Sequence, residues 1–426
     1  MNILILNQYG LPRGSAGITR HGDLGSVLVK RGHQVTVIAS GFDYLTRNIE
    51  RTGSQSMVKE NYDGVDFIWL KTTTYTANDT RRIRSMVDYS VKAAFACLRL
   101  TTKKPDIVVG SSPHPLTGLT SFFLANYYKV PFVLEIRDLW PSILADLGVI
   151  KEGGFAYKGL VILEKFLYKN ATKIITIPPL AKQRIQELGI NPDQATNIPN
   201  GIFIDKTKEG KNTEKIPESI QNILDNEKDK KIILYAGAHG VANDLYNVIN
   251  AADYLRQNKL NLYSKISFIF IGGGQERDKL IQSTKNKQHN NIYFIPPVDK
   301  SVIKLVLSHA DILLVHVAQA NVFKYGLSPN KLYDYLEAGK PILFSSANNF
   351  EIINQIEAGL TFAPGKPEEL AKAIETMLNI PDQEIMDMGE RGKSYVRSHH
   401  DWNTLAANFE KVLLEAINPT KTESLK

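Results

Sequence analysis

Short runs of apolar residues alternate along this chain with longer stretches in which apolar positions recur every three or four residues. A fully buried strand is apolar on both faces and a surface helix on one, so this alternation predicts an α/β protein with parallel sheets. In the first 200 residues the expected strands are Ile3–Leu6, Val35–Ala39, Val65–Leu70, Asp106–Gly110, Phe132–Ile136 and Lys173–Thr176. The stretch Ile18–Arg31 has a helical period and stops at Gly32, which completes a first βαβ unit.

The same alternation starts again after Asn200–Gly201. Strands are expected at Ile232–Tyr235, Ser267–Ile271, Ile292–Phe294, Ile312–Val315 and Pro341–Phe344, and an amphipathic helix at Trp402–Ile417. Two such halves predict two Rossmann-like doubly wound domains, 1–200 and 201–397, facing a cleft where ligands bind outside the carboxyl ends of the strands. Dehydrogenases and epimerases share this architecture, so it does not choose a reaction.

Size and composition narrow the class of protein. At 426 residues the chain is longer than one domain with a single hydrophobic core usually is. Its content of 43% hydrophobic and 22% charged residues is ordinary for a soluble protein. No run of about 18 apolar residues occurs, and the first residues read as a strand instead of a signal peptide, so we expect a cytoplasmic protein. A single cysteine, Cys97, excludes an internal disulfide and is expected in the core.

The net charge of +7 is concentrated in the first half. Residues 1–205 hold 24 Lys and Arg against 17 Asp and Glu, while the rest is balanced at 27 each. No nucleic-acid-binding module is evident, so an anionic membrane surface or a diphosphate-bearing acceptor is the better interpretation, with a merely soluble basic surface as the alternative. The segment Thr80–Phe95 reads as a basic amphipathic helix. Its apolar positions are Ile83, Met86, Val87, Val91, Ala94 and Phe95, and its flanking basic residues are Arg81, Arg82, Arg84 and Lys92.

The most informative segment for function is 325–342, a loop that opens a helix which stops at a glycine before a strand. The turn formed by Gly326, Leu327 and Ser328 leaves backbone N–H groups at the positive end of the helix, where a phosphate can bind without a metal. Lys331 adds a cation, and Asp334, one turn later, adds an acceptor for two hydroxyls. Diphosphate plus ribose is the predicted ligand. The alternative is an ordinary capped helix start with a solvated Asp334.

This segment, Ser-Pro-Asn-Lys-Leu-Tyr-Asp-Tyr-Leu-Glu-Ala-Gly-Lys-Pro, resembles one in family 4 of the retaining glycosyltransferases, in the variant of aminodeoxysugar transferases of bacterial capsule and O-antigen synthesis. The resemblance implies the GT-B architecture and a terminal helix, within 398–418, that crosses back to the first domain. Of the two glutamates that the family usually carries eight positions apart, the second falls on Asp334 and the first on Gly326. The contacts that the first glutamate makes to the donor sugar in the family are therefore not expected in this chain.

Several other loops follow predicted strands of the two halves. Gly14 and Gly17 lie in a glycine-rich loop after the first strand, at the place where the family's loop faces the donor diphosphate. Gly237 and His239 follow the strand Ile232–Tyr235, where many relatives carry an Arg and a Lys for the diphosphate. Because this loop lacks those two basic residues, Lys331 is the expected cation for the diphosphate. Pro297 resembles the family position at which neighbouring backbone atoms contact the base of the nucleotide.

On the side of the acceptor, His114 is held between two prolines at the end of the strand Asp106–Gly110, which suits a hydrogen bond to a sugar hydroxyl. Glu135, Arg137 and Asp138 resemble the family's Glu-x-Arg-Asp-x-Trp-Pro acceptor motif. Glu135 and Arg137 share a strand face, where they could pair, and Asp138 is a candidate base for the acceptor hydroxyl. The alternatives are a buried structural histidine and a structural ion pair.

No Asp-x-Asp pair and no zinc-like spacing of His and Cys occurs, so we expect neither a metal site nor a cofactor beyond the co-substrate. The sequence therefore predicts a metal-independent glycosyltransferase using a UDP-sugar and a polyprenyl-diphosphate-linked or glycan acceptor, peripheral on the inner face of the cell membrane. Two alternatives remain open: a UDP-sugar 2-epimerase of the same architecture, and a catalytically silent sugar-binding partner subunit.

Overall fold

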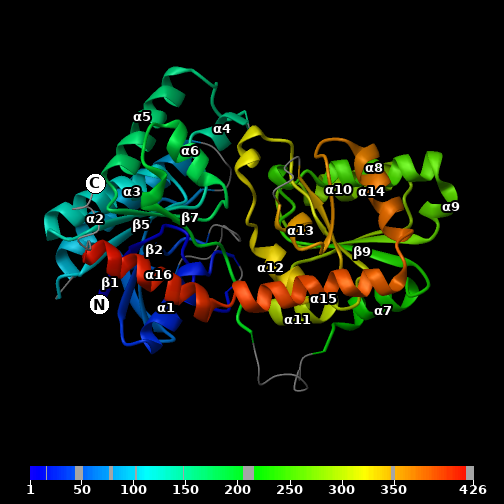
Figure 1. The fold of residues 1–426 in the computed structure, drawn as a ribbon, viewed down its shortest axis with the longest axis horizontal. Helices are drawn as coiled ribbons and strands as arrows, with labels where there is room; N and C mark the ends of the chain where they lie inside the picture. The colour runs from blue at the N-terminus through cyan, green and yellow to red at the C-terminus, as the bar shows by residue number, and fades with distance from the viewer. Residues whose placement is uncertain are drawn as a thin grey trace. The chain divides into compact units, whose positions relative to one another are not determined.

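The computed structural model describes residues 1–15, 17–43, 51–75, 80–100, 103–146, 148–204, 215–346 and 351–418. It divides into two compact units, the first formed by Met1–Gly201 with the segment that begins at Trp402, and the second by Ile202–Asp401. Each unit is an α/β layered structure (Figure 1). Among the described residues, no helix is both long and apolar enough to cross a membrane.

The first unit holds an eight-stranded sheet in the order β3-β4-β2-β1-β5-β6-β7-β8, in which β3 and β4 alone pair antiparallel. Its strands are β1 Asn2–Leu6, β2 Gln34–Ser40, β3 Met57–Tyr62, β4 Val65–Leu70, β5 Ile107–Ser112, β6 Phe132–Ile136, β7 Lys173–Thr176 and β8 Ala195–Asn197. The apolar runs become buried strands: every residue of β5 and of β6 is buried. The sequence missed β3 and β8, which alternate polar residues or are very short.

Helices cover both faces of this sheet. They are α1 Arg20–Lys30, α2 Thr80–Leu100, α3 Pro115–Tyr128, α4 Ser142–Asp146, α5 Phe155–Asn170, α6 Ala181–Glu187 and α16 Trp402–Ile417, with a 3-10 turn at Pro192–Gln194. Helices α2, α3 and α5 pack side by side in that order, while α16 packs on α1 (Figure 1). The predicted helix over Trp402–Ile417 is confirmed, and it buries Trp402, Phe409 and Leu413. Cys97 is buried in α2, as expected.

The second unit holds a fully parallel six-stranded sheet in the order β11-β10-β9-β12-β13-β14. Its strands are β9 Lys231–Ala236, β10 Ile266–Ile271, β11 Ile292–Ile295, β12 Ile312–Val315, β13 Ile342–Ser345 and β14 Gly359–Phe362. Its helices are α7 Glu218–Asn226, α8 Leu245–Asn258, α9 Leu260–Tyr263, α10 Arg277–Asn286, α11 Lys300–Leu307, α12 Asn330–Glu337, α13 Ile352–Gln355, α14 Pro367–Leu378 and α15 Asp382–His399, with 3-10 turns at Val241–Asn243 and Asn321–Tyr325.

The two faces of this second sheet each carry an apolar core. Along β9, Ile233 and Tyr235 point into one core and Ile232 and Leu234 into the other. The chain proceeds outward from β9 to β10 and β11, then returns to the other side of β9 as β12. The carboxyl ends of β9 and β12 therefore mark the point where the strand order reverses, which is where open α/β sheets bind ligands.

Candidate functional site

The loops that follow β9 and β10 pack against each other at the reversal point of the second unit. The loop after β9 packs on the loop after β10 so closely that a Cβ on Gly272 would lie 2.0 Å from the carbonyl oxygen of Gly237. The backbone N–H of Gly237 donates to Ile271, and that of His239 donates to Gly273. Only glycine fits at position 272, and the close packing holds the backbone of 237–240 firmly at the end of the sheet.

Lys331, in the first turn of α12, reaches across to the loop after β9. Its Nζ donates to the Oη of Tyr235 at 2.6 Å and to the Oδ1 of Asn243 at 3.3 Å, and lies 3.9 Å from the centre of the Tyr235 ring. A Cβ on Gly237 would stand 2.7 Å from the same ammonium. Although the lysine side chain is partly exposed, burial around its ammonium lowers the pKa of Lys331 to about 7. The predicted cation therefore lies against the loop that lacks one of its own.

Two buried histidines flank this lysine. His239 is fully buried among the rings of Tyr235, Phe270 and Phe294, and neither ring nitrogen has a partner among the described residues. Burial, with help from the charges of Arg277 and Lys331, lowers the pKa of His239 to about 4. His316 follows β12 and its Nδ1 bonds the carbonyl oxygen of Asn243 at 2.9 Å; burial lowers its pKa to about 4 as well. Both imidazoles are neutral at physiological pH, so Lys331 supplies the positive charge here.

The chain enters α12 through Pro329, whose backbone is extended (φ −70°, ψ 139°). Just before it, the Oγ of Ser328 lies 2.6 Å from the Oη of Tyr333. Gly326 is buried with φ 81° and ψ 163°, a conformation that is strained for any residue except glycine. A glutamate at position 326 would need a different backbone, which gives a physical reason for the missing first glutamate of the family pattern.

Glu351 supports the same loop, and no motif in the sequence pointed to it. This buried carboxylate accepts a hydrogen bond from the Oγ of Ser346 at 2.9 Å and another from the backbone N–H of Leu327. Burial raises the pKa of Glu351 to about 7. Glu351 therefore acts on the candidate site by positioning the backbone just before Ser328.

The remaining predicted donor-side residues border the same end of the sheet. Asp334 is partly buried and lies 3.6 Å from the Nζ of Lys300, which comes from α11. Pro297 is exposed beyond the end of β11, and a Cβ on Gly273 would lie 3.1 Å from its ring. Lys331, the 237–240 loop, the start of α12 and Pro297 thus gather at one end of this unit, and Asp334 follows one turn along α12.

In the first unit, the glycine-rich loop bends back between β1 and α1. Gly14 and Gly17 are exposed with φ values of 83° and 113°, which glycine adopts without strain. The backbone N–H of Leu11 donates to the carbonyl of Ile18 at 2.9 Å and closes the loop. Backbone at this loop is open to a ligand at the carboxyl end of β1.

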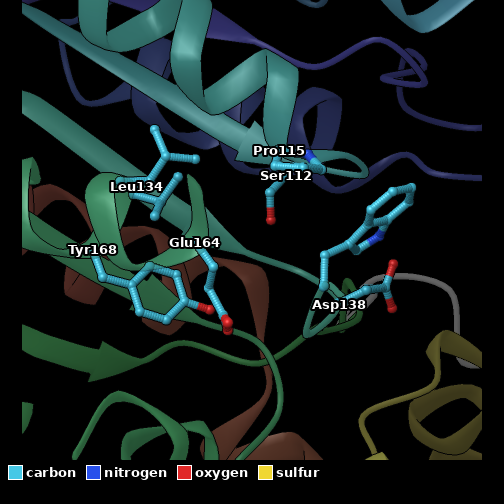
Figure 2. A pocket seen from close by; sticks show the side chains of 8 residues that line it. Ser112, Pro115, Leu134, Asp138, Glu164 and Tyr168 are labelled. Atoms are coloured by element: carbon cyan, nitrogen blue, oxygen red, sulfur yellow. The ribbon is translucent and has the colours of Figure 1, made fainter. Parts of the chain in front are cut away.

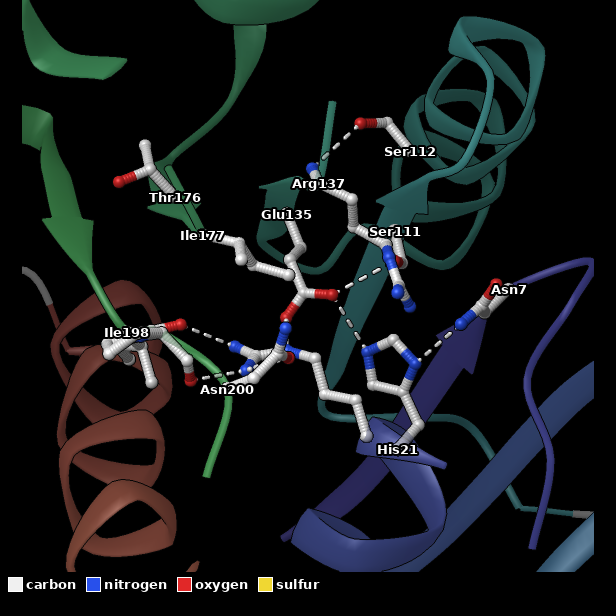
Figure 3. Close-up of polar contacts among 12 residues, drawn as sticks. Asn7, His21, Ser111, Ser112, Glu135, Arg137, Thr176, Ile177, Ile198 and Asn200 are labelled. Carbon is white, nitrogen blue, oxygen red and sulfur yellow. Dashed lines mark hydrogen bonds and ion pairs between the residues drawn. The ribbon is translucent and has the colours of Figure 1, made fainter. Parts of the chain in front are cut away.

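Glu135 lies at the centre of a buried polar network below that loop (Figure 3). Its Oε2 accepts from the Nε of Arg20 at 2.8 Å, and its Oε1 accepts from Ser111 at 2.9 Å and lies 3.1 Å from the Nε2 of His21. Arg20 also donates to the carbonyls of Ile198 and Pro199. The charge of Arg20 and the hydrogen bonds hold the pKa of Glu135 well below its usual range despite its burial.

This arrangement adds a partner that the sequence did not suggest. Glu135 forms an ion pair with Arg20, from the first turn of α1, and the charge of its face-sharing neighbour Arg137 also lowers the pKa of Glu135. The carboxylate is fully buried and both oxygens are occupied, so it does not fit a direct catalytic role. It instead fixes the start of α1, and with it the loop that carries Gly14 and Gly17.

His114 caps the start of α3 and is fully buried. Its Nε2 lies 2.6 Å from the Oε1 of Gln8 and 3.1 Å from the Oγ1 of Thr117. Burial lowers the pKa of His114 to about 3, so the imidazole is neutral at physiological pH. Contact with a sugar hydroxyl would require its ring to become accessible.

Asp138 is exposed just after β6 and lines a small pocket of the first unit (Figure 2). The other lining residues are Ser112, Pro115, Leu134, Trp140, Glu164, Leu167 and Tyr168. Glu164 is bonded by both Nε and Nη2 of Arg184, so Asp138 is the carboxylate of this pocket with the better access to solvent. The pocket is small, about 20 Å³, so Asp138 is a candidate for contact with an acceptor hydroxyl through its exposed carboxylate and not through an enclosed sugar site.

Within the described residues, no group of three or more His, Cys, Asp or Glu side chains is placed to hold a metal ion. The sequence also missed Tyr235, Asn243 and Arg20 as parts of the sites. Tyr235 and Asn243 are ordinary residues of a strand end and a turn, and only the fold brings them to Lys331.

Comparisons with known proteins identify the family to which both halves of the chain belong. Residues 217–395 match the family model described as Glycosyl transferases group 1, and residues 16–201 match the Glycosyl transferase 4-like domain. WcaI of Escherichia coli strain K12, whose name assigns it to colanic acid biosynthesis, is 24% identical over 323 residues, covering 75% of this chain and 76% of WcaI. WbjE of Pseudomonas aeruginosa, named as a glycosyltransferase, is 23% identical over 71% of this chain and 74% of its own length.

Solved structures share the whole fold at low identity. Sucrose-phosphate synthase from Thermosynechococcus elongatus matches with a TM-score of 0.73 and 14% identity, over 98% of this chain and 100% of that chain. Anabaena HepE in complex with UDP-glucose matches with a TM-score of 0.63 and 13% identity, over 97% of this chain and 100% of that chain. Both neighbours have the GT-B architecture, so the predicted fold class is confirmed.

Proposed function

Since this chain is a glycosyltransferase, with a 4-like domain at residues 16–201 and a group 1 domain at residues 217–395, we propose that it transfers a sugar from a UDP-sugar, with retention of configuration, to an acceptor in bacterial surface polysaccharide synthesis. The observation that carries the donor assignment is the ammonium of Lys331, held at the reversal point of the second sheet beside the backbone of Gly237. One relative, WcaI, is named for colanic acid biosynthesis and supports the polysaccharide role, and the HepE complex with UDP-glucose supports the nucleotide.

In the proposed donor complex the diphosphate rests on the start of α12, with Ser328 offering its backbone N–H group and Lys331 its ammonium, while the backbone N–H of Leu327 stays bonded to Glu351. Asp334 accepts hydrogen bonds from the two ribose hydroxyls and leaves its ion pair with Lys300 to do so. Backbone near Pro297 contacts the uracil, and Gly237 with His239 completes the diphosphate site. Helix dipole and lysine together neutralise the leaving group without a metal ion.

The first unit would bind the acceptor. We propose that Asp138 holds the acceptor hydroxyl and that His114 contacts the donor sugar once its ring becomes accessible, while Gly14 and Gly17 let backbone approach the diphosphate. The bond from the anomeric carbon to the β-phosphate oxygen breaks as the acceptor oxygen bonds to the same face of that carbon. The departing phosphate takes the hydroxyl proton, so no protein nucleophile is required.

We assign the donor to the N-acetylated aminodeoxysugars, because the segment 328–341 resembles the variant typical of those transferases. The acceptor is proposed to be a polyprenyl-diphosphate-linked sugar or a growing glycan, reached at the inner, anionic face of the cell membrane. The exposed carboxylate of Asp138 can accept a hydrogen bond from a hydroxyl of either acceptor. A UDP-sugar 2-epimerase remains the second candidate, because it has the same two-domain architecture.

A donor screen tests this proposal. Each UDP-sugar is first tested for thermal stabilisation of the protein, and the stabilising donors are then incubated with a lipid-linked acceptor while UDP release is followed. Release of UDP that depends on the acceptor supports a transferase. Isomerisation of the donor without an acceptor would establish the epimerase, and binding without turnover would establish a silent sugar-binding subunit.

A further inference from the structure

Helix α2 carries apolar residues on two opposite sides. Its inner side packs against the first unit with Met86, Tyr89, Ala93 and Cys97, all of which are buried. Its outer side exposes a second set, Ile83, Val87, Val91, Phe95 and Leu98, each between 46% and 61% exposed. The helical spacing predicts Met86 on the same face as Ile83 and Val87. That prediction is wrong, because Met86 lies on the buried side. A surface helix needs only one apolar face, so the outer set requires another explanation.

The neighbouring helices continue this outer set. Helix α3 exposes Phe123 and Tyr127, and α5 exposes Phe155, Ile162 and, less strongly, Phe166. The helices lie side by side: the Oη of Tyr128 donates to the carbonyl of Cys97 in α2, and the rings of Phe122 and Phe166 are 5.1 Å apart. We call these ten exposed side chains of α2, α3 and α5 the outer apolar face. Soluble proteins seldom expose so many large apolar side chains on adjacent elements.

Basic residues accompany the outer apolar face. Seven exposed ones lie in the same helices: Arg81, Arg84, Lys92, Arg99, Lys158, Lys165 and Lys169. Arg82 is partly buried and its charge acts on His114 and Asp138 instead. The same helices carry two acidic residues, Asp88, which is bonded to Lys92 at 2.9 Å, and Glu164, which is buried and bonded to Arg184. The face therefore combines large apolar side chains with a strong positive charge.

We propose that the outer apolar face inserts into the head-group region of an anionic lipid bilayer. Aromatic and aliphatic side chains would enter the boundary between head groups and acyl chains, while the arginines and lysines bind lipid phosphates. A second copy of the chain is the other candidate occupant. An isologous dimer through this face would bring two sets of like charges together, whereas anionic lipids neutralise them.

The proposal names the surface through which the chain binds the membrane that the proposed function invokes. It rests on that function only for the reason why the chain binds a membrane. Attachment by α2, α3 and α5 would hold the first unit at the surface where a lipid-linked acceptor lies. The apolar contribution distinguishes it from attraction by charge alone, because burial of apolar side chains is not screened by salt.

Vesicle co-sedimentation without donor or acceptor tests the proposal. The probes are vesicles of phosphatidylcholine alone and of phosphatidylcholine with phosphatidylglycerol, at low salt and at about 1 M salt, where the Debye length is about 3 Å. The test variant combines Val87→Ser, Phe95→Ser and Phe123→Ser, all on exposed positions. The matched control combines Val241→Ser, Leu260→Ser and Met386→Ser, which are comparably exposed in the second unit. A third variant combines Arg84→Gln, Arg99→Gln and Lys165→Gln.

The wild type and the control should pellet with anionic vesicles and retain a salt-resistant fraction. The apolar variant should partition at least about tenfold less and lose the salt-resistant fraction. The basic variant should lose binding mainly at low salt. Equal pelleting of the apolar variant and the control would overturn the proposal, as would a wild-type dimer that the apolar variant dissociates without any change in vesicle binding.

Circular dichroism and UDP affinity, measured on the same variants, keep a folding defect apart from a lost surface. Normal UDP affinity with lost vesicle binding supports the proposal. Vesicle binding by a protein that transfers no sugar would contradict the proposed function and leave the outer apolar face intact.

Discussion

Replacing Lys331 by Met removes one ammonium from the donor site and keeps most of the length of the side chain. The lysine contacts Tyr235 and Asn243 but forms no ion pair among the described residues, so its removal leaves no unpaired carboxylate behind. We therefore expect a folded protein whose UDP affinity is reduced and whose uridine affinity is nearly unchanged.

The size of the loss follows from the geometry. Two unit charges 4 Å apart interact by about 4 kcal/mol at an effective dielectric constant of 20, which sets a ceiling. A hydrogen bond to a charged group contributes a net 1.5–3 kcal/mol or so, because the ammonium gives up other partners when it binds the diphosphate. The expected loss of UDP affinity for Lys331→Met is therefore about 10- to 150-fold.

The same residue predicts the pH dependence. Burial lowers the pKa of Lys331 to about 7, so the free protein loses this positive charge as the pH rises through that region. A bound diphosphate raises this pKa, so UDP binding takes up protons and weakens as the pH rises above 7. His239 and His316, with pKa values of about 4, stay neutral over this range. The pH dependence should disappear in Lys331→Met.

Titration calorimetry between pH 7 and pH 9, with UDP and with uridine, measures these effects. Lys304→Met, on an exposed position of α11, is the control for the loss of one positive charge. Equal losses for UDP and uridine would show that Lys331 is structural. A UDP affinity that is independent of pH in the wild type would refute the assignment of Lys331 as the titrating group.

Three further predictions concern other parts of the two units. Asp334→Ala should weaken UDP and uridine alike by about 1.5 to 3 kcal/mol, measured by calorimetry with Asp278→Ala as control, and unchanged affinity would remove Asp334 from the ribose site. Glu135→Gln should destabilise the first unit by about 3 to 5 kcal/mol in denaturant unfolding, since it breaks a buried ion pair; a loss of activity at full stability would restore a direct role. Gly272→Ala should cost more than about 3 kcal/mol because its Cβ meets the carbonyl of Gly237, whereas Gly32→Ala, in open space at φ 90°, should cost about 1 to 2 kcal/mol; equal costs would contradict the packing argument.

Strands that are short apolar runs buried inside a sheet could be predicted from the sequence. The strands Val65–Leu70, Phe132–Ile136, Lys173–Thr176 and Ile312–Val315 have the predicted bounds, because each is a short apolar run buried on both faces. Strand β3 was missed since Met57–Tyr62 lies at the sheet edge and alternates polar residues. The turn at Asp63–Gly64, with both φ values positive, is a favourable hairpin signal that could have revealed it.

The candidate site was predictable where a motif is continuous in the chain. Lys331, Ser328 and Asp334 lie within one segment, so their helical arrangement follows from spacing. The pairing of Glu135 with Arg20 could not be foreseen, because the two residues are 115 positions apart and meet only through the sheet. The second apolar side of α2 was hidden for another reason: helical spacing groups Met86 with Val87, and only packing separates buried from exposed positions.

The central claim is that sugar passes from UDP to an acceptor with its configuration retained. The most direct measurement is NMR and mass analysis of the product formed from a UDP-N-acetylaminosugar and a polyprenyl-diphosphate-linked acceptor, with UDP quantified in the same reaction. We predict an acceptor enlarged by one sugar in the donor's anomeric configuration, with one UDP released per transfer. An inverted linkage, or an isomerised donor with an unchanged acceptor, would contradict the account.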